Sequence, residues 1–249
     1  MRSFVQIGVN AALLGGVSFL RLIRSVSHSF VVRWEALAFF YTQRIKGFDV
    51  PSEPRLDEGG RQYFLNCLDR CKFYLEYGSG GSTVEAARRH KRFITVESDR
   101  FFLEAVKRRI AGTTGNNDIG EYIYCNIGST GPLGAPLSKT LTQQRLDLWR
   151  KYPDGPWMRI AAQNGMLPDL ILIDGRFRVA CALTSIKYLK KSASFEMLVD
   201  DYANRPHYGE IERFAKLSSM QGRMAVFTPA KFDMDDLNRS LTHYVLDWR

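Results

Sequence analysis

Residues 72–99 read KFYLEYGSGGSTVEAARRHKRFITVESD, and this stretch decides the fold. An apolar run, 72–77, leads into a cluster of glycines and a helix-like segment at 83–90, and a second apolar run follows at 92–97. A strand, a helix and a strand at this spacing predict a βαβ unit with two parallel strands. In such a sheet, ligands bind beyond the carboxyl ends of the strands, and glycines there let the backbone approach a ligand closely. The stretch therefore predicts a nucleotide-like pocket at a glycine loop, residues 78–83.

The rest of the chain continues the alternation of strands and helices. Further strands are expected at 121–127, 169–173, 194–199, 223–228 and 242–248, and further helices at 60–70, 100–111, 177–190, 207–219 and 233–240. The pattern predicts an α/β fold with a Rossmann-like, mainly parallel sheet and helices on both faces. The main domain is expected at 59–249, with a Gly- and Pro-rich insertion at 128–168 that is either a lid or a surface loop.

Residues 1–58 are expected to form an N-terminal helical extension, with a helix at 28–47. Residues 4–20 are apolar and uncharged, and Arg21 and Arg24 close the segment. The length is borderline for a spanning helix, so a membrane anchor or interfacial helix, a cleaved signal and a helix packed on the domain remain open. The expected location is cytoplasmic, with membrane association through this segment as the alternative.

The composition is that of a globular protein, with 45% hydrophobic and 24% charged residues, and it excludes wholesale disorder. A formal charge of +9, from 35 Lys and Arg against 26 Asp and Glu, favours anionic partners. No dense basic block of the kind found in nucleic-acid-binding arms is present. The cysteines lack paired spacing and are expected to be buried reduced thiols; they are Cys67, Cys71, Cys125 and Cys181.

Two carboxylates define the ligand of the glycine loop. Glu76 stands two residues before Gly78, and the loop lacks the third glycine that a pyrophosphate-binding loop normally uses. An acid at this position would repel a pyrophosphate and favour a cation, such as the ammonium and sulfonium of S-adenosylmethionine. Glu97 follows Gly78 by 19 residues, at the end of the second strand, where a carboxylate can accept hydrogen bonds from both hydroxyls of a ribose.

With E-x-G-x-G at 76–80, Glu97 and a terminal strand pair at 223–248, the sequence resembles the class I S-adenosylmethionine-dependent methyltransferases. The resemblance covers about residues 60–249 and implies a seven-stranded sheet with a terminal antiparallel strand. It also implies a set of residues that contact the donor. Glu76, Gly78, Ser79 and Gly80 would surround its amino-acid part, Glu97 would bind the ribose, Ser98 would lie beside the adenosine, and Asn126 and Ile127 would face the adenine.

Three aspartates end the fourth and fifth predicted strands: Asp174, Asp200 and Asp201. Because parallel strands end at one rim, these carboxylates could converge, and three hard oxygen ligands suit Mg²⁺, which would activate a hydroxyl. The segments DGRFR and VDDY are similar to the metal-dependent small-molecule and sugar O-methyltransferases, and the aspartates fall on that family's metal positions. Arg176 replaces a further acid of that family. Arg176 and Arg178 could bind an anionic group of the substrate or pair with the aspartates, leaving no metal site.

His207 follows the same rim and is either a proton relay or a capping group, and Tyr202 is expected to line the substrate pocket. Together with Asp174 and Asp200, His207 completes the set of expected catalytic residues. The leading hypothesis is methyl transfer from S-adenosylmethionine to an oxygen of a small-molecule or glycan-like acceptor, with Mg²⁺ as a second cofactor. The alternatives are a nucleic-acid or protein methyltransferase, disfavoured because an NPPY-like segment is absent, and a binding protein of the same fold without catalysis.

Overall fold

The computed structural model describes residues 36–115, 119–163 and 165–249. The chain divides into two compact units, 1–46 and 47–249. In the described part of the first unit the chain is helical from 36 to 46, and its last turn is a π-helix, Thr42–Lys46. The segment 4–20 lies outside the described residues. Within the described ranges, no helix is long and apolar enough to cross a membrane.

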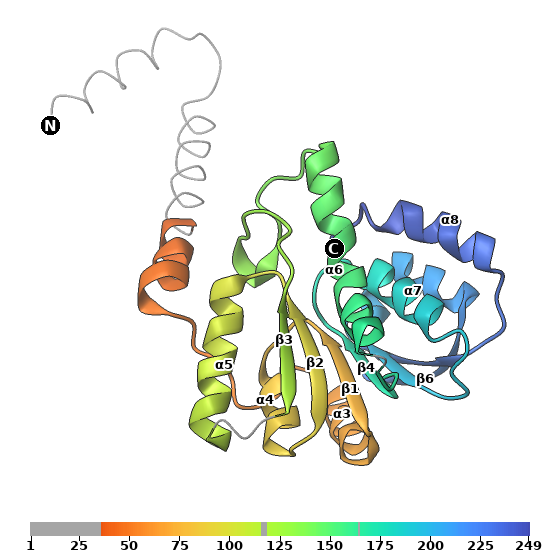
Figure 1. Ribbon diagram of the computed structural model, residues 1–249, viewed down its shortest axis with the longest axis horizontal. Coiled ribbons are helices and arrows are strands. Elements are labelled where there is room, and N and C mark those ends of the chain that lie inside the picture. The colour runs from red at the N-terminus through yellow and green to blue at the C-terminus, as the bar shows by residue number, and fades with distance from the viewer. Residues whose placement is uncertain (1–35, 116–118, 164) are drawn as a thin grey trace, which may run out of the picture. The chain divides into compact units, whose positions relative to one another are not determined.

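The larger unit is built on a seven-stranded sheet in the order β3-β2-β1-β4-β5-β7-β6 (Figure 1). Neighbouring strands are parallel from β3 to β5, while β7 runs antiparallel to both β5 and β6. The strands are Phe73–Tyr77 (β1), Arg92–Glu97 (β2), Gly120–Tyr124 (β3), Leu170–Ile173 (β4), Glu196–Val199 (β5), Ala215–Gln221 (β6) and Met224–Pro229 (β7). This sheet confirms the predicted fold class.

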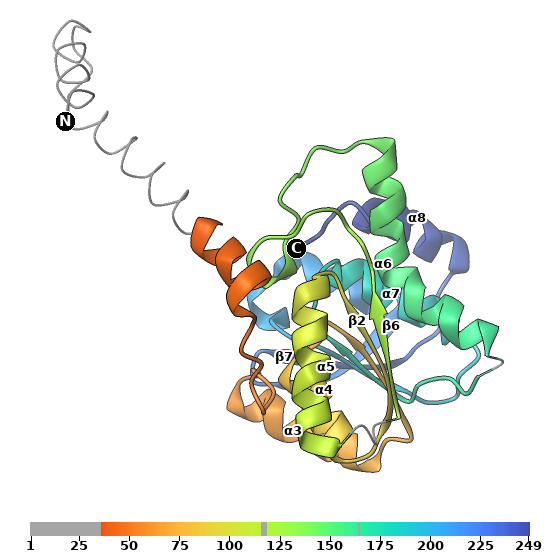
Figure 2. The same cartoon turned by 60° about the vertical axis from the view of Figure 1, so that its left-hand side comes forward.

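Helices cover both faces of the sheet, as Figures 1 and 2 show. One face carries α3 (Glu58–Arg70), α4 (Gly81–Arg88) and α5 (Arg100–Thr114), and the other carries α6 (Gln143–Ala162), α7 (Arg178–Tyr188) and α8 (Met234–Tyr244). Side chains alternate along each strand, so Phe73 and Leu75 enter the core under α6 and α7, whereas Tyr74 enters the core under α3 and α4. The four cysteines are buried and free, as expected.

Two predictions near the C-terminus are wrong. The segment expected as a helix at 207–219 forms a 3-10 helix, η4 (Pro206–Arg213), followed by strand β6. The segment expected as a strand at 242–248 contains the end of α8. Along β6, inward-facing and outward-facing residues alternate, but several inward-facing residues are small or polar. The alternation of apolar and polar residues that indicates a strand is therefore not visible in the sequence. The apolar residues near the C-terminus, among them Leu237 and Leu241, recur instead at the helical spacing.

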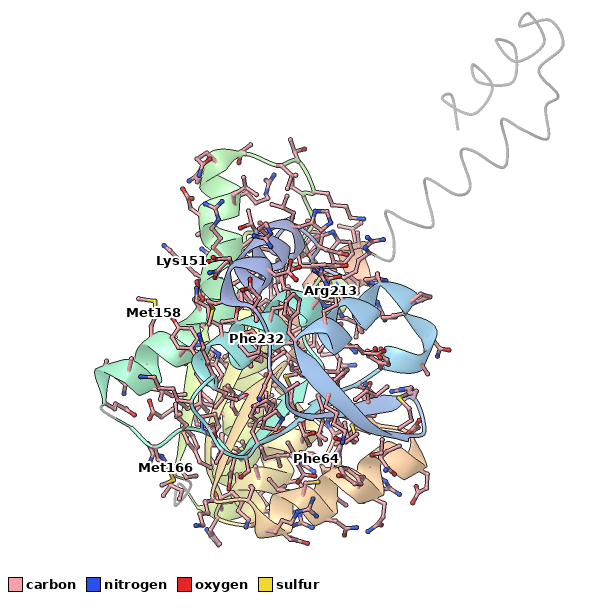
Figure 3. The ribbon with its side chains drawn as sticks, turned by 90° about the vertical axis from the view of Figure 1, so that its right-hand side faces the viewer. Phe64, Lys151, Met158, Met166, Arg213 and Phe232 are labelled. Atoms are coloured by element: carbon pink, nitrogen blue, oxygen red, sulfur yellow. The ribbon has the colours of Figure 1, made fainter. Side chains whose placement is uncertain are left out.

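The insertion contains far more helix than predicted. The sequence predicts a lid or a surface loop at 128–168, but within this segment α6 spans Gln143–Ala162 and includes Pro153 and Pro156. The prolines do not end the helix because its inner face is anchored by buried aromatic residues, and the Tyr77 hydroxyl donates to the Pro153 carbonyl at 2.6 Å. The outer face is solvated: Lys151 and Met158 project from it (Figure 3).

Residues 47–57, which the sequence assigns to the extension, belong to the larger unit. Asp57 caps α3 through a hydrogen bond from Gly60 N and accepts another from Arg223 N at 2.6 Å, in the turn between β6 and β7. The Arg223 side chain donates to the Arg55 carbonyl at 3.3 Å. This segment therefore fastens the start of the unit to its C-terminal hairpin.

Candidate functional site

The glycine loop between β1 and α4 is held by close backbone packing. Gly78 has a φ of +95°, and a Cβ there would lie 2.6 Å from N and Cα of Gly175, which follows β4. Gly81 packs against the Glu53 carbonyl, so a side chain there would overlap backbone. A Cβ on Gly80, in contrast, would meet nothing within 4 Å. The loop is thus packed against backbone at Gly78 and Gly81 and open at Gly80.

Glu76 lies beneath this loop and is fully buried. Its carboxylate accepts hydrogen bonds from the hydroxyls of Ser82, Thr83 (2.6 Å) and Thr95 (3.0 Å). Burial raises the pKa of Glu76 to about 7, although these hydrogen bonds oppose the rise. The carboxylate that was expected to face a cation therefore binds the loop and the start of α4, and it fixes their conformation.

Glu97, at the end of β2, is joined directly to the glycine loop. One carboxylate oxygen accepts hydrogen bonds from Ser79 N at 3.2 Å and Ser79 Oγ at 3.0 Å, and the other accepts from the backbone N–H groups of Ser98 (2.7 Å) and Asp99 (2.9 Å). Burial raises the pKa of Glu97 against these hydrogen bonds. The structure therefore brings Gly78, Ser79, Gly80, Glu97 and Ser98 together at one place on the rim, above the buried Glu76.

The first part of the insertion contacts the same residues. Ser98 Oγ donates to the Gly134 carbonyl at 3.2 Å, and Thr130 Oγ1 donates to Asp99 at 3.2 Å. Thr130 is buried by this contact. Sequence reasoning missed Thr130 and Gly134, because nothing in a Gly- and Pro-rich segment indicates which of its residues reaches the end of β2.

Asn126 and Ile127 occupy different environments after β3. Asn126 is exposed, and its side-chain oxygen accepts a hydrogen bond from Gly128 N at 2.9 Å. Ile127 is fully buried in the core, and its carbonyl accepts a hydrogen bond from Trp149 Nε1 at 3.0 Å. Of the two residues expected beside the adenine, only Asn126 has an exposed side chain.

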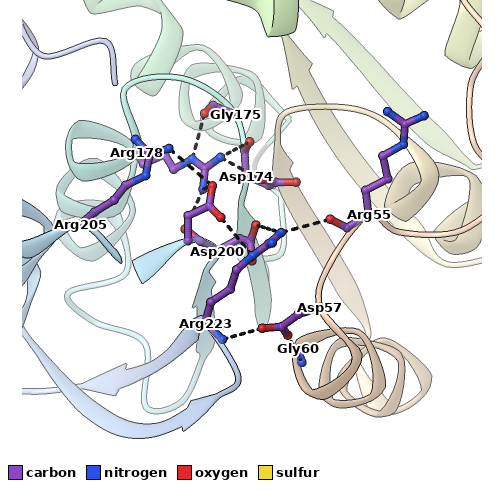
Figure 4. A network of polar contacts seen from close by, with 10 residues as sticks. Arg55, Asp57, Gly60, Asp174, Gly175, Arg178, Asp200, Arg205 and Arg223 are labelled. Carbon is purple, nitrogen blue, oxygen red and sulfur yellow. Dashed lines mark hydrogen bonds and ion pairs between the residues drawn. The ribbon is translucent and has the colours of Figure 1, made fainter. Parts of the chain in front are cut away.

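The three aspartates of the rim are each opposed by arginines, and Figure 4 shows Asp174 and Asp200 beside Arg178 and Arg223. Asp200 is almost fully buried, and both of its oxygens accept hydrogen bonds from Arg223, each at 3.1 Å. Asp174 accepts a hydrogen bond from Arg178 at 2.9 Å. Asp201 forms ion pairs with Arg178 (3.2 Å), Arg223 (3.0 Å) and Arg205 (3.5 Å). Guanidinium groups thus occupy the places around these carboxylates that a cation would need.

The structure gives the expected magnesium site no support. In the ranges that the structure describes, no three His, Cys, Asp or Glu side chains are grouped so that they could hold a metal ion. The physical reason is charge compensation: the carboxylates that would bind Mg²⁺ are neutralised by arginine hydrogen bonds instead.

Arg178, the first residue of α7, is buried beneath this rim and links the ends of β4 and β5. Its side chain is 5% exposed, and it donates to the carbonyls of Asp174, Gly175 and Asp200 in addition to its ion pairs. All of these are intramolecular partners, so Arg178 is a structural residue in this arrangement. Burial raises the pKa of Asp174 to about 7 despite the neighbouring Arg178. A carboxyl with such a pKa can exchange a proton near neutral pH.

The remaining expected residues lie at the same end of the sheet. Tyr202 donates to Glu212 at 2.5 Å and packs edge-on against Phe227. Nε2 of His207 is buried, lies 3.9 Å from Asp247 and makes no hydrogen bond to a described residue. Burial lowers the pKa of His207, and the nearby Asp247 opposes the shift. Arg176 is half-buried.

Comparison with solved structures gives an informative likeness. A methyltransferase-like protein from Silicibacter pomeroyi DSS-3 is 28% identical in sequence, with a TM-score of 0.69 over 79% of this chain and 100% of that protein. An O-methyltransferase from Bacillus cereus in complex with SAH is 15% identical, with a TM-score of 0.43 over 81% of this chain and 100% of that one. TM-scores this low do not establish a shared fold. No protein-family model and no curated protein matches the sequence.

The sheet order, the antiparallel β7 and the likeness to the Silicibacter protein together identify the class I methyltransferase fold. The larger unit carries it, with the glycine loop at the end of β1 and an acid at the end of β2, where the resemblance places the donor.

Proposed function

We propose that this protein is an S-adenosylmethionine-dependent methyltransferase that methylates a hydroxyl of a small-molecule or glycan-like acceptor. The observation that carries the proposal is the pair of hydrogen bonds from Ser79 to Glu97, which joins the glycine loop to the acid at the end of β2. In the donor complex, the loop would surround the amino-acid part and Glu97 would exchange hydrogen bonds from Ser79 for those of the ribose hydroxyls. The methyltransferase fold supports this assignment.

Asp174 is the proposed general base. The contact between Gly78 and Gly175 holds the donor loop against the turn that carries Asp174, so donor and base would lie on adjoining strands. The acceptor oxygen would attack the methyl carbon as the carbon–sulfur bond breaks, and the hydroxyl proton would pass to the Asp174 carboxylate. The products are a methyl ether and S-adenosylhomocysteine. Most of the rate enhancement would come from holding the oxygen in line with the methyl group.

The donor site is tested by isothermal titration of the product S-adenosylhomocysteine, which shares the adenosine and amino-acid parts of the donor, into the wild-type protein and the Glu97→Gln variant. The matched control is Glu121→Gln, a glutamate of the neighbouring strand β3 that pairs with Arg159 away from the glycine loop. We expect Glu97→Gln to weaken binding by about tenfold or more, because a ribose hydroxyl loses a charged acceptor, and Glu121→Gln to leave it unchanged. A wild-type protein that does not bind the donor would refute the proposal.

The reaction is tested with methyl-labelled donor and a panel of hydroxylated acceptors, in the presence of a chelator. Transfer under these conditions would support Asp174 rather than a metal ion as the activating group. If the donor binds and no acceptor is methylated, the non-catalytic binding protein becomes the better description. Transfer to oligonucleotides with a steep salt dependence would favour the nucleic-acid alternative.

A further inference from the structure

Arg176 lies at the rim of the sheet, and its side chain pairs with none of the described residues. It lies two residues after Asp174, in the turn between β4 and α7, and its side chain is half-buried. Its Nε is buried and makes no hydrogen bond, and no carboxylate of the described residues forms an ion pair with it. Arg178, two residues further on, is in contrast saturated by Asp174, Asp201 and three carbonyls. The two arginines of the segment DGRFR therefore differ in their contacts, since Arg178 is paired and Arg176 has no partner among the described residues.

Tyr208 provides a second unsatisfied donor, in the 3-10 helix that packs against α7, the helix that begins two residues after Arg176. It lies in η4, and it is fully buried. Its hydroxyl has no hydrogen-bond partner among the described residues. The Arg205 guanidinium lies over the Tyr208 ring, 5.5 Å from its centre. Burial raises the pKa of Tyr208, and the positive charges of Arg178, Arg205 and Arg176 oppose the rise.

Leaving such groups without partners destabilises a folded protein, because each has lost its water without gaining a hydrogen bond. Buried donors of this kind are rare in native proteins and call for an explanation. A guanidinium and a phenolic hydroxyl both donate, so the group that satisfies them must accept, and an oxyanion is the acceptor that a guanidinium binds best. Arg176 stands close to Asp174 in the chain, so an oxyanion held there would lie beside the proposed site of methyl transfer.

We propose that Arg176 and Tyr208 bind an anionic group of the methyl acceptor, a carboxylate or a phosphate monoester. The acceptor would then be an acid, such as a uronic acid or a sugar phosphate, rather than a neutral sugar. The inference rests on the proposed methyl transfer for its role in the reaction, while the anion site itself can be tested without the donor.

The test is isothermal titration of D-glucuronate and D-glucose 6-phosphate into the full-length protein, with D-glucose as the neutral control. We expect at least one of the two anions to bind and D-glucose not to bind, and the anion that binds distinguishes a carboxylate from a phosphate. Arg176→Met should weaken this binding by on the order of 10- to 100-fold, and Tyr208→Phe by about fivefold. Thr184→Val is the matched control, because it also removes a buried hydroxyl without a partner, but from the middle of α7.

Thermal unfolding without added anion separates a binding role from a structural one. Because the removed groups have no partners among the described residues, Arg176→Met, Tyr208→Phe and Thr184→Val should each unfold at the same temperature as the wild type or higher. A lower unfolding temperature for Arg176→Met would show that Arg176 supports the fold and would overturn the proposal.

The proposal is also overturned if neither anion binds, if D-glucose binds equally well, or if Arg176→Met binds the anion as the wild type does. S-adenosylhomocysteine is titrated in parallel, so that a failure of the proposed anion site can be distinguished from a failure of the proposed methyltransferase activity. Donor binding without anion binding would overturn this inference alone. Anion binding that depends on Arg176 in a protein that fails to bind the donor would leave the anion site standing and remove the methyltransferase assignment.

Discussion

The buried Glu76 makes the stability of this protein depend on pH in a way that one substitution should abolish. Burial raises its pKa from 4.5 to about 7. A carboxyl whose pKa is raised by folding stabilises the native state fully below pH 4.5, and this contribution declines as the pH rises to about 7 and then stays constant. At roughly 1.4 kcal/mol for each pH unit, the wild type loses about 3 kcal/mol of this contribution across the window.

Glu76→Gln removes the titration and retains the shape of the side chain. The amide can still meet the hydroxyls of Ser82, Thr83 and Thr95, because each hydroxyl can rotate to donate or accept. The free energy of unfolding of the variant, relative to the wild type, should therefore rise by about 3 kcal/mol between pH 4.5 and pH 7.5. Other groups with raised pKa values, such as Asp174, titrate in both proteins and cancel in the difference.

The assay is urea unfolding of both proteins, followed by circular dichroism, at intervals of half a pH unit. A constant difference between the two proteins would mean that folding leaves the pKa of Glu76 unchanged, with its hydrogen bonds offsetting the effect of burial. A wild type that gains stability over the variant as the pH rises would mean that folding lowers the pKa of Glu76. Either result would refute the reasoning.

Three further predictions concern the loop and the rim. Gly78→Ala should lower the free energy of unfolding by about 3 kcal/mol, because φ is +95° and the new Cβ meets backbone at 2.6 Å. Gly80→Ala places a Cβ that meets nothing within 4 Å, so it should change the free energy of unfolding by under about 0.5 kcal/mol and weaken donor binding instead. Asp174→Asn should lower the rate of methyl transfer by about 100-fold and abolish the rise of activity with pH near 7 that a base with a pKa of about 7 produces. Arg223→Met should cost about 3 kcal/mol in urea unfolding, because it leaves the buried carboxylate of Asp200 unpaired; an unchanged midpoint would contradict this.

The sequence predicts the glycine loop and its acid well, because the signals are local. A strand, a glycine turn and a carboxylate 19 residues beyond Gly78 constrain one another within a single βαβ unit, and the structure places Glu97 against Ser79. The hairpin of β6 and β7 is harder, because β6 is an edge strand with small and polar residues at inward positions. Its register depends on β7 rather than on its own pattern.

The chemistry of the rim could not be predicted from the sequence, because an arginine that neutralises its aspartates lies far from them along the chain. Asp200 looks like a metal ligand in sequence, yet its partner Arg223 lies in a hairpin turn 23 residues away. Similarly, Arg176 and Arg178 are equivalent in sequence. The structure separates them: Arg178 begins α7 and reaches the carbonyls after β4, whereas Arg176 does not. Such distinctions depend on tertiary contacts that no spacing rule encodes.

The Asp57–Arg223 contact determines where this chain can be shortened. Starting the protein at residue 59, where the sequence pattern places the domain boundary, would delete the carboxylate that accepts from Arg223 N and the carbonyl that accepts from its side chain. The same cut would strip the Glu53 backbone from Gly81 and uncover the start of α4. A shortened protein for crystallisation or donor titration should therefore begin near residue 47, which keeps the larger compact unit whole.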